Sequence, residues 1–440
     1  MLKLDKPCRL VYDAPMTKKQ LTPRTLIALC WFVYFASYLT RQNYNAALAP
    51  MLEDLGAAKS ALSLAGTAGF VAYGVGQPVS GLLLRRVDAR RMIFLGLCAS
   101  AVCNLLLAVC PSWVPGPRLP LAMTAVWCAN GFAQAMLWPA LVQFMARQLS
   151  PADYKRATIH VNIAGSAGTV TVYLLVPLCV ALSTWRWVFV FAAAVALIAA
   201  LFWRRLSPVD SGQLTVDSEK LTMHKDQLST VNCQLSTAKP VSMRKLLTGF
   251  GLAPILLAVA LQGVLRDGVP AWMPVLITES YPAFTSVKSV LTAAVLPLFA
   301  IVSLQITGSI AKRINHELRS AAWFYAAGAL AALGLGLCVT RWLPGSVAFM
   351  ALLTGCMHGV NLVAVCQLPA RFGRYGATGA AAGIINAFVY AGSALSMLGT
   401  ALLAERFGWQ ATVWVWFAVA VIGTGIFVLF TKKARKSLYE

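Results

Sequence analysis

The sequence predicts an all-α polytopic membrane protein in which twelve transmembrane helices form two pseudo-symmetric six-helix bundles. Composition, the spacing of apolar segments and an internal repeat predict this class. Of the 440 residues, 59% are hydrophobic and only 12% are charged, whereas soluble domains carry about 25% charged residues. Since a helix needs about 20 mostly apolar residues to cross the hydrocarbon core, the long apolar stretches are predicted membrane spans.

Apolar stretches divide the chain into twelve expected spans and three polar segments. The spans are 25–46, 60–84, 91–110, 120–146, 157–182, 186–203, 250–277, 286–311, 320–340, 345–370, 377–403 and 410–430. The predicted domains are an N-terminal tail (1–24), a first bundle (25–203), a linker (204–248), a second bundle (250–430) and a C-terminal tail (431–440). The linker is polar and repeats the fragments GQLTVD, DQLSTV and CQLSTA, which carry no recognisable chemistry.

An internal repeat indicates that the second bundle duplicates the first. Five pairs of residues are separated by 224 to 227 positions: Trp185 and Trp409, Asn162 and Asn386, Gly131 and Gly355, Arg41 and Arg266, and Gly81 and Gly308. Six is an even number of spans, so both copies run in the same direction. Transporters built from repeats bind substrate between the repeats near the bilayer midplane, which predicts a site facing both halves.

The basic residues behind the net charge of +22 are expected to lie mostly on one side of the membrane. With the N-terminus inside, 29 of the 37 Lys and Arg residues fall on the cytoplasmic side, as the positive-inside rule requires. The basic balance therefore predicts membrane topology, not a nucleic-acid partner. We expect a monomer in a bacterial inner membrane, with both termini cytoplasmic and no signal peptide. The eleven Cys form no CxxC pair, and no metal or cofactor is predicted.

A guanidinium inside the first span is the clearest pointer to a binding site. Tyr34, Tyr38, Arg41 and Asn45 lie at i, i+4, i+7 and i+11, which places them in one stripe of a helix. A charge near the bilayer centre costs at least about 2.5–3.5 kcal/mol unless it faces a cavity or a partner, and no carboxylate lies in 25–46. Arg41 is predicted to bind an anion, with a structural ion pair as the alternative.

Polar residues also recur at helical spacing in other spans. Besides the second buried guanidinium, Arg266, the candidates for substrate contacts are Tyr73, Gln134, Trp138, Asn162, His358, Asn386 and Tyr390. For each stripe, hydrogen bonding between packed helices is the alternative interpretation. Together the stripes predict a wet central site.

The chain resembles the major facilitator superfamily over nearly its whole length, and within it the organophosphate:phosphate antiporters. Four stretches carry the resemblance: YLTRQNY, AYGVGQ, GFAQAMLWPA and LRDGVPAWMP. The resemblance implies a twelve-helix transporter and places the family's two substrate-binding arginines on Arg41 and Arg266, with family aromatic positions at Tyr38 and Tyr73.

Several polar positions depart from the family pattern. Gln42 and Gln77 stand where related glycerol-phosphate transporters carry lysines, and the span 5 histidine of the family falls near Ser166. The acid that precedes the span 7 tryptophan is replaced by Ala271, while an acid appears at Asp267.

Two guanidiniums suit a phosphate or a carboxylate because their planar forks donate paired hydrogen bonds. An empty site holding both would carry about +2, which should resist closure and so predicts obligate exchange of anions. The resemblance implies that the exchanged anions are an organophosphate and phosphate. One alternative is a proton-coupled organic anion (carboxylate) symporter. In it, protonation of Asp267 or of His358 couples anion transport to proton transport, and Asp267 can pair with Arg41. Another is a non-transporting membrane sensor of a phosphorylated ligand. An enzyme is not predicted, because the spans hold no paired nucleophile and base.

Overall fold

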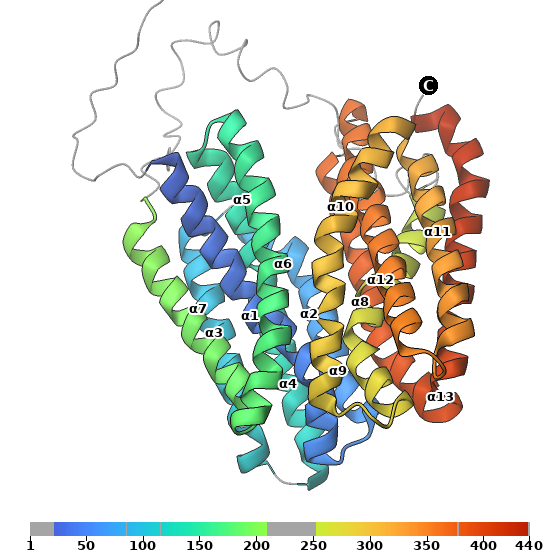
Figure 1. The fold of residues 1–440 in the computed structure, drawn as a ribbon. Coiled ribbons are helices and arrows are strands. Elements are labelled where there is room, and N and C mark those ends of the chain that lie inside the picture. The colour runs from blue at the N-terminus through green and yellow to red at the C-terminus, as the bar shows by residue number, and fades with distance from the viewer. Residues whose placement is uncertain (1–21, 85, 115, 209–251, 376–377, 439–440) are drawn as a thin grey trace, which may run out of the picture.

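A computed structural model describes residues 22–84, 86–114, 116–208, 252–375 and 378–438. The described chain is helical throughout, and its membrane-crossing helices form two bundles (Figure 1). The first bundle contains α1 (Pro23–Leu55), α2 (Lys59–Leu83), α3 (Ala89–Trp113), the turn η1 (Gly116–Arg118), α4 (Leu119–Ala135), α5 (Leu137–Gln148), α6 (Pro151–Leu182) and α7 (Arg186–Leu206). In this bundle α4 and α5 together make one span.

The second bundle follows the same order. It contains α8 (Leu252–Ser280), α9 (Ser286–Ala293), α10 (Val295–Ile314), α11 (Glu317–Cys338), α12 (Leu343–Val360), η3 (Asn361–Gln367), η4 (Leu368–Tyr375) and α13 (Thr378–Leu438). Here α9 and α10 form one span, and α13 forms two. The two spans of α13 are separated at Gly408, whose φ of 77° breaks the helix and is accessible to glycine at little cost.

By length and composition, eight described stretches could cross a membrane, and one of them, Ala381–Phe430, holds the last two spans. The remaining spans are α1, α2 and the pair formed by α4 and α5. Within that pair, α4 has 17 residues and α5 has 12. The fold therefore has the expected twelve spans. Most of the tail 1–24 and of the linker 204–248 lies outside the described residues. Within 431–440, α13 continues to Leu438, because no Pro or Gly interrupts it.

Helix starts follow local sequence signals. Thr22 and Ser150 each precede a proline at the first helical position, and their hydroxyls accept a hydrogen bond from the backbone N–H of Thr25 and Asp153. Such capped starts satisfy N–H groups that have no partner within the helix. As a result α1 begins two residues and α6 six residues before the spans predicted for them.

The repeat is visible in matched side-chain contacts. Trp185 Nε1 donates to Asp54 Oδ2 at 2.8 Å, and Trp409 Nε1 donates to Glu279 Oε2 at 2.8 Å. The two tryptophans are 224 residues apart and the two acids 225 apart. In each bundle the tryptophan at the start of the sixth span thus bonds the end of the first span.

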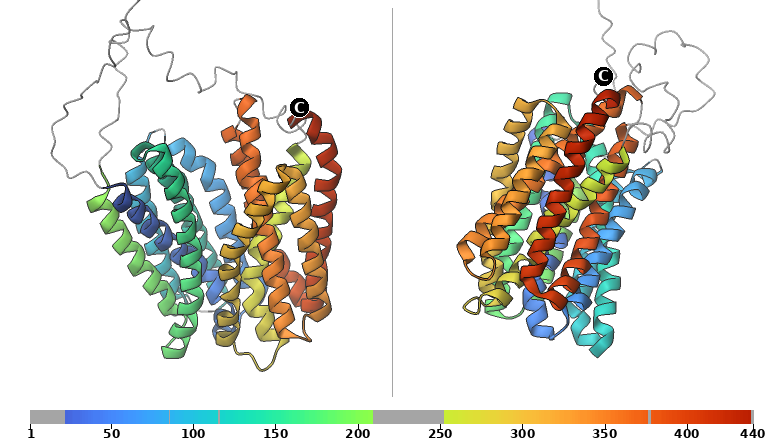
Figure 2. Two further views of the ribbon diagram at one scale, coloured as in Figure 1. Left: turned by 45° about the horizontal axis from the view of Figure 1, so that its top comes forward. Right: turned by 90° about the vertical axis from the view of Figure 1, so that its right-hand side faces the viewer.

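The two bundles converge at the end opposite the chain termini (Figures 1 and 2). There Lys59 Nζ lies 2.9 Å from Glu279 Oε1, and the backbone N–H of Ser60 donates to Glu405 Oε1 at 2.7 Å. Both contacts join α2 of the first bundle to the second bundle. A third contact lies deeper, where the Tyr173 hydroxyl donates to the carbonyl oxygen of Pro270 at 3.1 Å.

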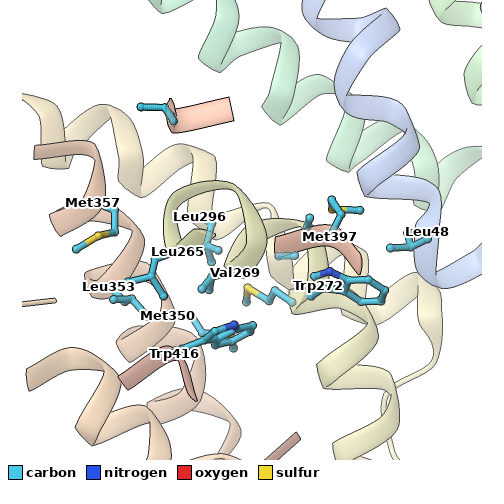
Figure 3. Close-up of a cluster of buried hydrophobic side chains, with 14 of the residues drawn as sticks. Leu48, Leu265, Val269, Trp272, Leu296, Met350, Leu353, Met357, Met397 and Trp416 are labelled. Atoms are coloured by element: carbon cyan, nitrogen blue, oxygen red, sulfur yellow. The ribbon is translucent and has the colours of Figure 1, made fainter. Parts of the chain in front are cut away.

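The hydrophobic core matches this arrangement. The largest cluster of buried side chains runs through both bundles and includes Leu48 of α1, Trp272 of α8 and Met397 of α13 (Figure 3). A second cluster, which includes Ile27 and Trp203, belongs to the first bundle alone and lies toward the chain termini. The described residues of the two bundles therefore share their main apolar core toward the converging end.

Candidate functional site

Arg41 lies on α1, and its guanidinium lies over the rings of two tyrosines. Its Cζ is 4.3 Å from the ring centroid of Tyr38 and 4.9 Å from that of Tyr73 on α2. Such contacts contribute about 0.5–2 kcal/mol, depending on desolvation. Among the described residues the Arg41 side chain has no carboxylate or hydrogen-bond partner, and it is partly exposed. The N–H groups of this guanidinium are therefore available to an anion.

The aromatic side chains around Arg41 come from both bundles. The rings of Tyr34 and Tyr38 are 5.0 Å apart, and Tyr34 is also 5.0 Å from Trp138 of α5. Tyr73 lies 4.6 Å from Tyr390, which belongs to α13. Tyr390 is close enough to interact electrostatically with both Arg41 and Arg266. It therefore links the two predicted arginines across the interface between the bundles.

Arg266, on α8, is already occupied by protein ligands. Its Nε and Nη2 donate to the two carboxylate oxygens of Asp267 at 2.8 and 2.7 Å, and its Nη1 donates to Asn361 Oδ1 at 2.7 Å. Asp267 Oδ2 also accepts a hydrogen bond from the Ser393 hydroxyl at 2.5 Å. The expected empty-site charge of about +2 is wrong for this structure, because Asp267 neutralises Arg266. Asp267 pairs with Arg266 and not with Arg41, which was the partner that the symporter alternative allowed.

Close packing of α8 against α13 explains how Ser393 reaches Asp267. A Cβ on Gly263 would lie 2.1 Å from the carbonyl oxygen of Val389, and a Cβ on Gly392 would lie 1.8 Å from that of Ala260. Only glycine fits at both positions, so the backbones touch one helical turn before the ion pair. These small residues therefore serve close crossing of helices.

Asn361 is positioned by an irregular turn. It opens η3, a π-helical segment that continues α12, and such turns often occur at functional sites because they reorient side chains. His358, one turn earlier, is partly exposed and interacts electrostatically with both Arg266 and Asp267. In the sequence, Asn361 and Ser393 follow the predicted residues His358 and Tyr390 by three positions each. Their contacts with the ion pair, however, depend on the bend of α12 and on the α8–α13 crossing.

Gln134 belongs to a buried hydrogen-bond network inside the first bundle. Its Nε2 donates to the hydroxyls of Thr40 and Ser100, each at 2.7 Å. Asn130 donates to the backbone oxygen of Thr40 at 3.0 Å, and Asn104 accepts from Asn43 at 2.6 Å. Hydrogen bonds of this kind are typical between packed membrane helices. A role of Gln134 in substrate binding stays a prediction.

The other predicted residues are spread more widely. Asn45 is buried and donates to Gln42 Oε1 at 3.4 Å, at the limit of a hydrogen bond. Asn386 is partly exposed one turn before Tyr390 on α13, and Asn162 is exposed on α6. The structure places Tyr38 and Tyr73 against Arg41. Tyr34 and Tyr390 contact these two rings, and Trp138 contacts Tyr34.

Two six-helix bundles with a charged and aromatic group of side chains between them define a membrane transporter. The chain belongs to the Major Facilitator Superfamily, whose family model matches residues 30–389. It is 26% identical over 393 residues to a glycerol-3-phosphate transporter of Bacillus subtilis, which covers 86% of this chain and 85% of the relative. It is also 25% identical to the membrane sensor protein UhpC of Escherichia coli over 41% of this chain and 40% of that protein. A probable hexose phosphate transport protein of Chlamydia trachomatis is 25% identical over 33% of this chain and 32% of its own length.

Solved structures support the fold alone. The nucleoside transporter NupG superposes with a TM-score of 0.68 at 13% identity, covering 92% of this chain and 99% of that one. The xylose transporter XylE of E. coli, in an inward open conformation, gives a TM-score of 0.69 at 12% identity, with 92% and 96% coverage. The protein is therefore an integral multi-pass membrane protein of this superfamily.

Proposed function

We propose that the protein exchanges a small organophosphate for inorganic phosphate across the membrane by alternating access. The observation that carries the proposal is Arg41, a guanidinium held by two tyrosine rings at the bundle interface without a carboxylate partner among the described residues. Arginine is the side chain best suited to paired hydrogen bonds with phosphate. The glycerol-3-phosphate and hexose phosphate transporters among the relatives support the same substrate class.

Alternating access would use the joined end of the bundles. With both termini in the cytoplasm, the contacts of Lys59 with Glu279 and of Ser60 with Glu405 close the outer side. Anion binding at Arg41 would draw Tyr390 and the second bundle toward the first, since Tyr73 and Tyr390 already touch across the interface. The closed complex would then open to the other side, which requires the contacts at the outer end to break.

The test is exchange in proteoliposomes loaded with labelled phosphate. Glycerol-3-phosphate or a hexose phosphate added outside should drive efflux of label, and no efflux should occur without an exchangeable anion. Arg41→Lys should reduce this efflux strongly, because an ammonium lacks the planar fork. Arg118→Lys is the matched control, since Arg118 is exposed in η1 far from the site. Normal exchange by the Arg41→Lys variant would refute the role of Arg41.

A proton-coupled carboxylate symporter is the second candidate. Asp267 favours it, because a carboxylate bound to Arg266 could change its protonation when a substrate competes for that arginine. In that case carboxylate uptake should follow an imposed pH gradient. Asp267→Asn should then abolish accumulation and retain exchange, whereas unchanged accumulation would eliminate the coupling role.

A sensor role is the third candidate, supported by the similarity to a membrane sensor protein. A sensor should bind organophosphate without moving it, so measurable flux in the same liposomes would exclude that role.

We further propose a monomer in a bacterial inner membrane, with cytoplasmic termini and a cytoplasmic linker at 204–248. Reporter fusions after residues 114, 208 and 282 would test the sidedness, because only the second should report the cytoplasm.

A further inference from the structure

We propose that Asp267 makes the site selective for singly charged phosphates, so that phosphate diesters and monoprotonated monoesters bind in preference to dianionic monoesters. This inference rests on the proposed function and names its substrate class more narrowly. Its basis is the ion pair between Arg266 and Asp267 of α8. Among the described residues, this pair leaves Arg41 as the cation of the site that has no carboxylate partner.

The ionised side chains at the bundle interface carry a net charge of one. Arg41 and Arg266 each carry one positive charge, and Asp267 removes one of them through a contact of 2.7 Å. With a neutral His358 the group keeps a single positive charge. A monoanion therefore neutralises the site on binding. A dianion leaves one excess negative charge among partly buried groups, where unbalanced charge is more costly than in water.

The carboxylate is held too firmly to yield its place to a ligand easily. Asp267 receives two hydrogen bonds from Arg266 and one from Ser393, and Ser393 is itself fixed by the glycine crossing of α8 and α13. The side chains of Arg266 and Asp267 retain 13% and 21% of their exposure. The pair is accessible to a ligand, which meets a neutral surface there. Among the described residues of the site, the cation without a carboxylate partner is Arg41.

The surroundings of Arg41 suit an esterified phosphate. The Arg41 guanidinium lies over the rings of Tyr38 and Tyr73, and no described carboxylate or hydrogen-bond acceptor occupies its N–H groups. Tyr390 and Trp138 extend the aromatic wall on either side. Aromatic rings with polar tips accept a ligand body that carries both apolar and hydroxyl groups. A diester keeps one charge near neutral pH, whereas a phosphate monoester carries about −1.5 to −2 at pH 7.

The test compares glycerol-3-phosphate with its methyl diester by calorimetry on the purified full-length protein. At pH 7.5 the diester should bind about tenfold more tightly or better, given the cost of an uncompensated like charge. Asp267→Asn should lower that preference by about tenfold or reverse it, because the neutral amide restores the second cation. Glu53→Gln makes the same chemical change at an exposed carboxylate on the outer end of α1 and should keep the wild-type ratio.

A pH series on the wild-type protein tests the inference without any variant. At pH 5.5 the monoester becomes mostly singly charged, so the two affinities should converge. The charged and titratable groups that interact with Asp267 are Arg266 and, from α12, His358. From α13, Tyr390 interacts with Arg266. The diester does not titrate in this range, so its own affinity reports any protonation of the protein, and the ratio isolates the charge of the ligand.

Each outcome decides between the two claims. A wild-type protein that prefers the monoester at pH 7.5, or a ratio unchanged by both Asp267→Asn and pH, overturns the inference and leaves the proposed function standing. If neither phosphate binds at any pH, the proposed function fails and the inference falls with it.

Discussion

Removing the charge of Glu279 should loosen the joined end of the two bundles. Its carboxylate accepts hydrogen bonds from Lys59 Nζ to both oxygens at 2.9 Å and from Trp409 Nε1 at 2.8 Å. Lys59 belongs to the opposite bundle and Trp409 to the same one. In Glu279→Gln the amide oxygen can still accept from Trp409, so the contact that is lost is mainly the one between the bundles.

The size of the effect follows from exposure. The side chains of Lys59 and Glu279 retain 17% and 39% of their accessible surface, so solvent screens the pair and its contribution lies within about 0.2–1 kcal/mol. A loss of about 1 kcal/mol changes the ratio of open to closed molecules by a factor of about 5. Larger shifts are not expected, because the Ser60–Glu405 contact and the apolar core around Trp272 remain.

Hydrogen–deuterium exchange of the backbone amides measures this shift without attaching a probe to the protein. Backbone amides in 57–63 and 276–284 should exchange up to about fivefold faster in Glu279→Gln, since exchange there follows the population of the open form. Added salt should speed exchange in the wild type and have less effect on the variant. Glu53→Gln, which changes a neighbouring exposed carboxylate, should exchange as the wild type does. Identical exchange in Glu279→Gln and wild type would refute the assignment of Lys59–Glu279 as a contact that closes this end.

Three further variants probe the site and the packing around it. Arg41→Lys should weaken organophosphate binding by about 10-fold to 100-fold in calorimetry, the range of a hydrogen bond to a charged group; an unchanged affinity would contradict the role of Arg41. Gly392→Val should fail to yield folded protein in a detergent melting assay, because its Cβ would overlap the Ala260 carbonyl, and a wild-type melting temperature would argue against the close crossing. Asn104→Ala removes the partner of the Asn43 amide and should lower thermal stability by about 1–3 kcal/mol, with substrate affinity retained; a stability equal to wild type would mean that the network contributes nothing.

Much of the fold could be predicted because membrane spans are determined by local composition. A bilayer core demands long apolar helices wherever the chain crosses it, and the repeat made the two-bundle architecture visible through residues such as Trp185 and Trp409. The sequence also holds Asp54 and Glu279 at nearly the same offset. Their pairing with the two tryptophans could have been proposed from that offset, and it was found only in the structure.

The site was predicted in part. The spacing of Tyr34, Tyr38 and Arg41 on one face of a helix follows from helical periodicity, and the structure shows these side chains in contact. Periodicity could not assign the partner of each polar residue. Gln134, at an equally suitable spacing, is bound into the network of the first bundle, because its orientation depends on how α4 packs against α1 and α3.

The sequence by itself determined the class of the protein, the number of spans, the duplication and the presence of two arginines within the membrane, because each depends on composition or on spacing along the chain. Only the tertiary structure decided the charge of the site. Adjacent helical residues point about 100° apart, so nothing in the sequence joins Arg266 to Asp267. Their ion pair forms because Asn361 and Ser393, from two other helices, hold the guanidinium and the carboxylate against each other.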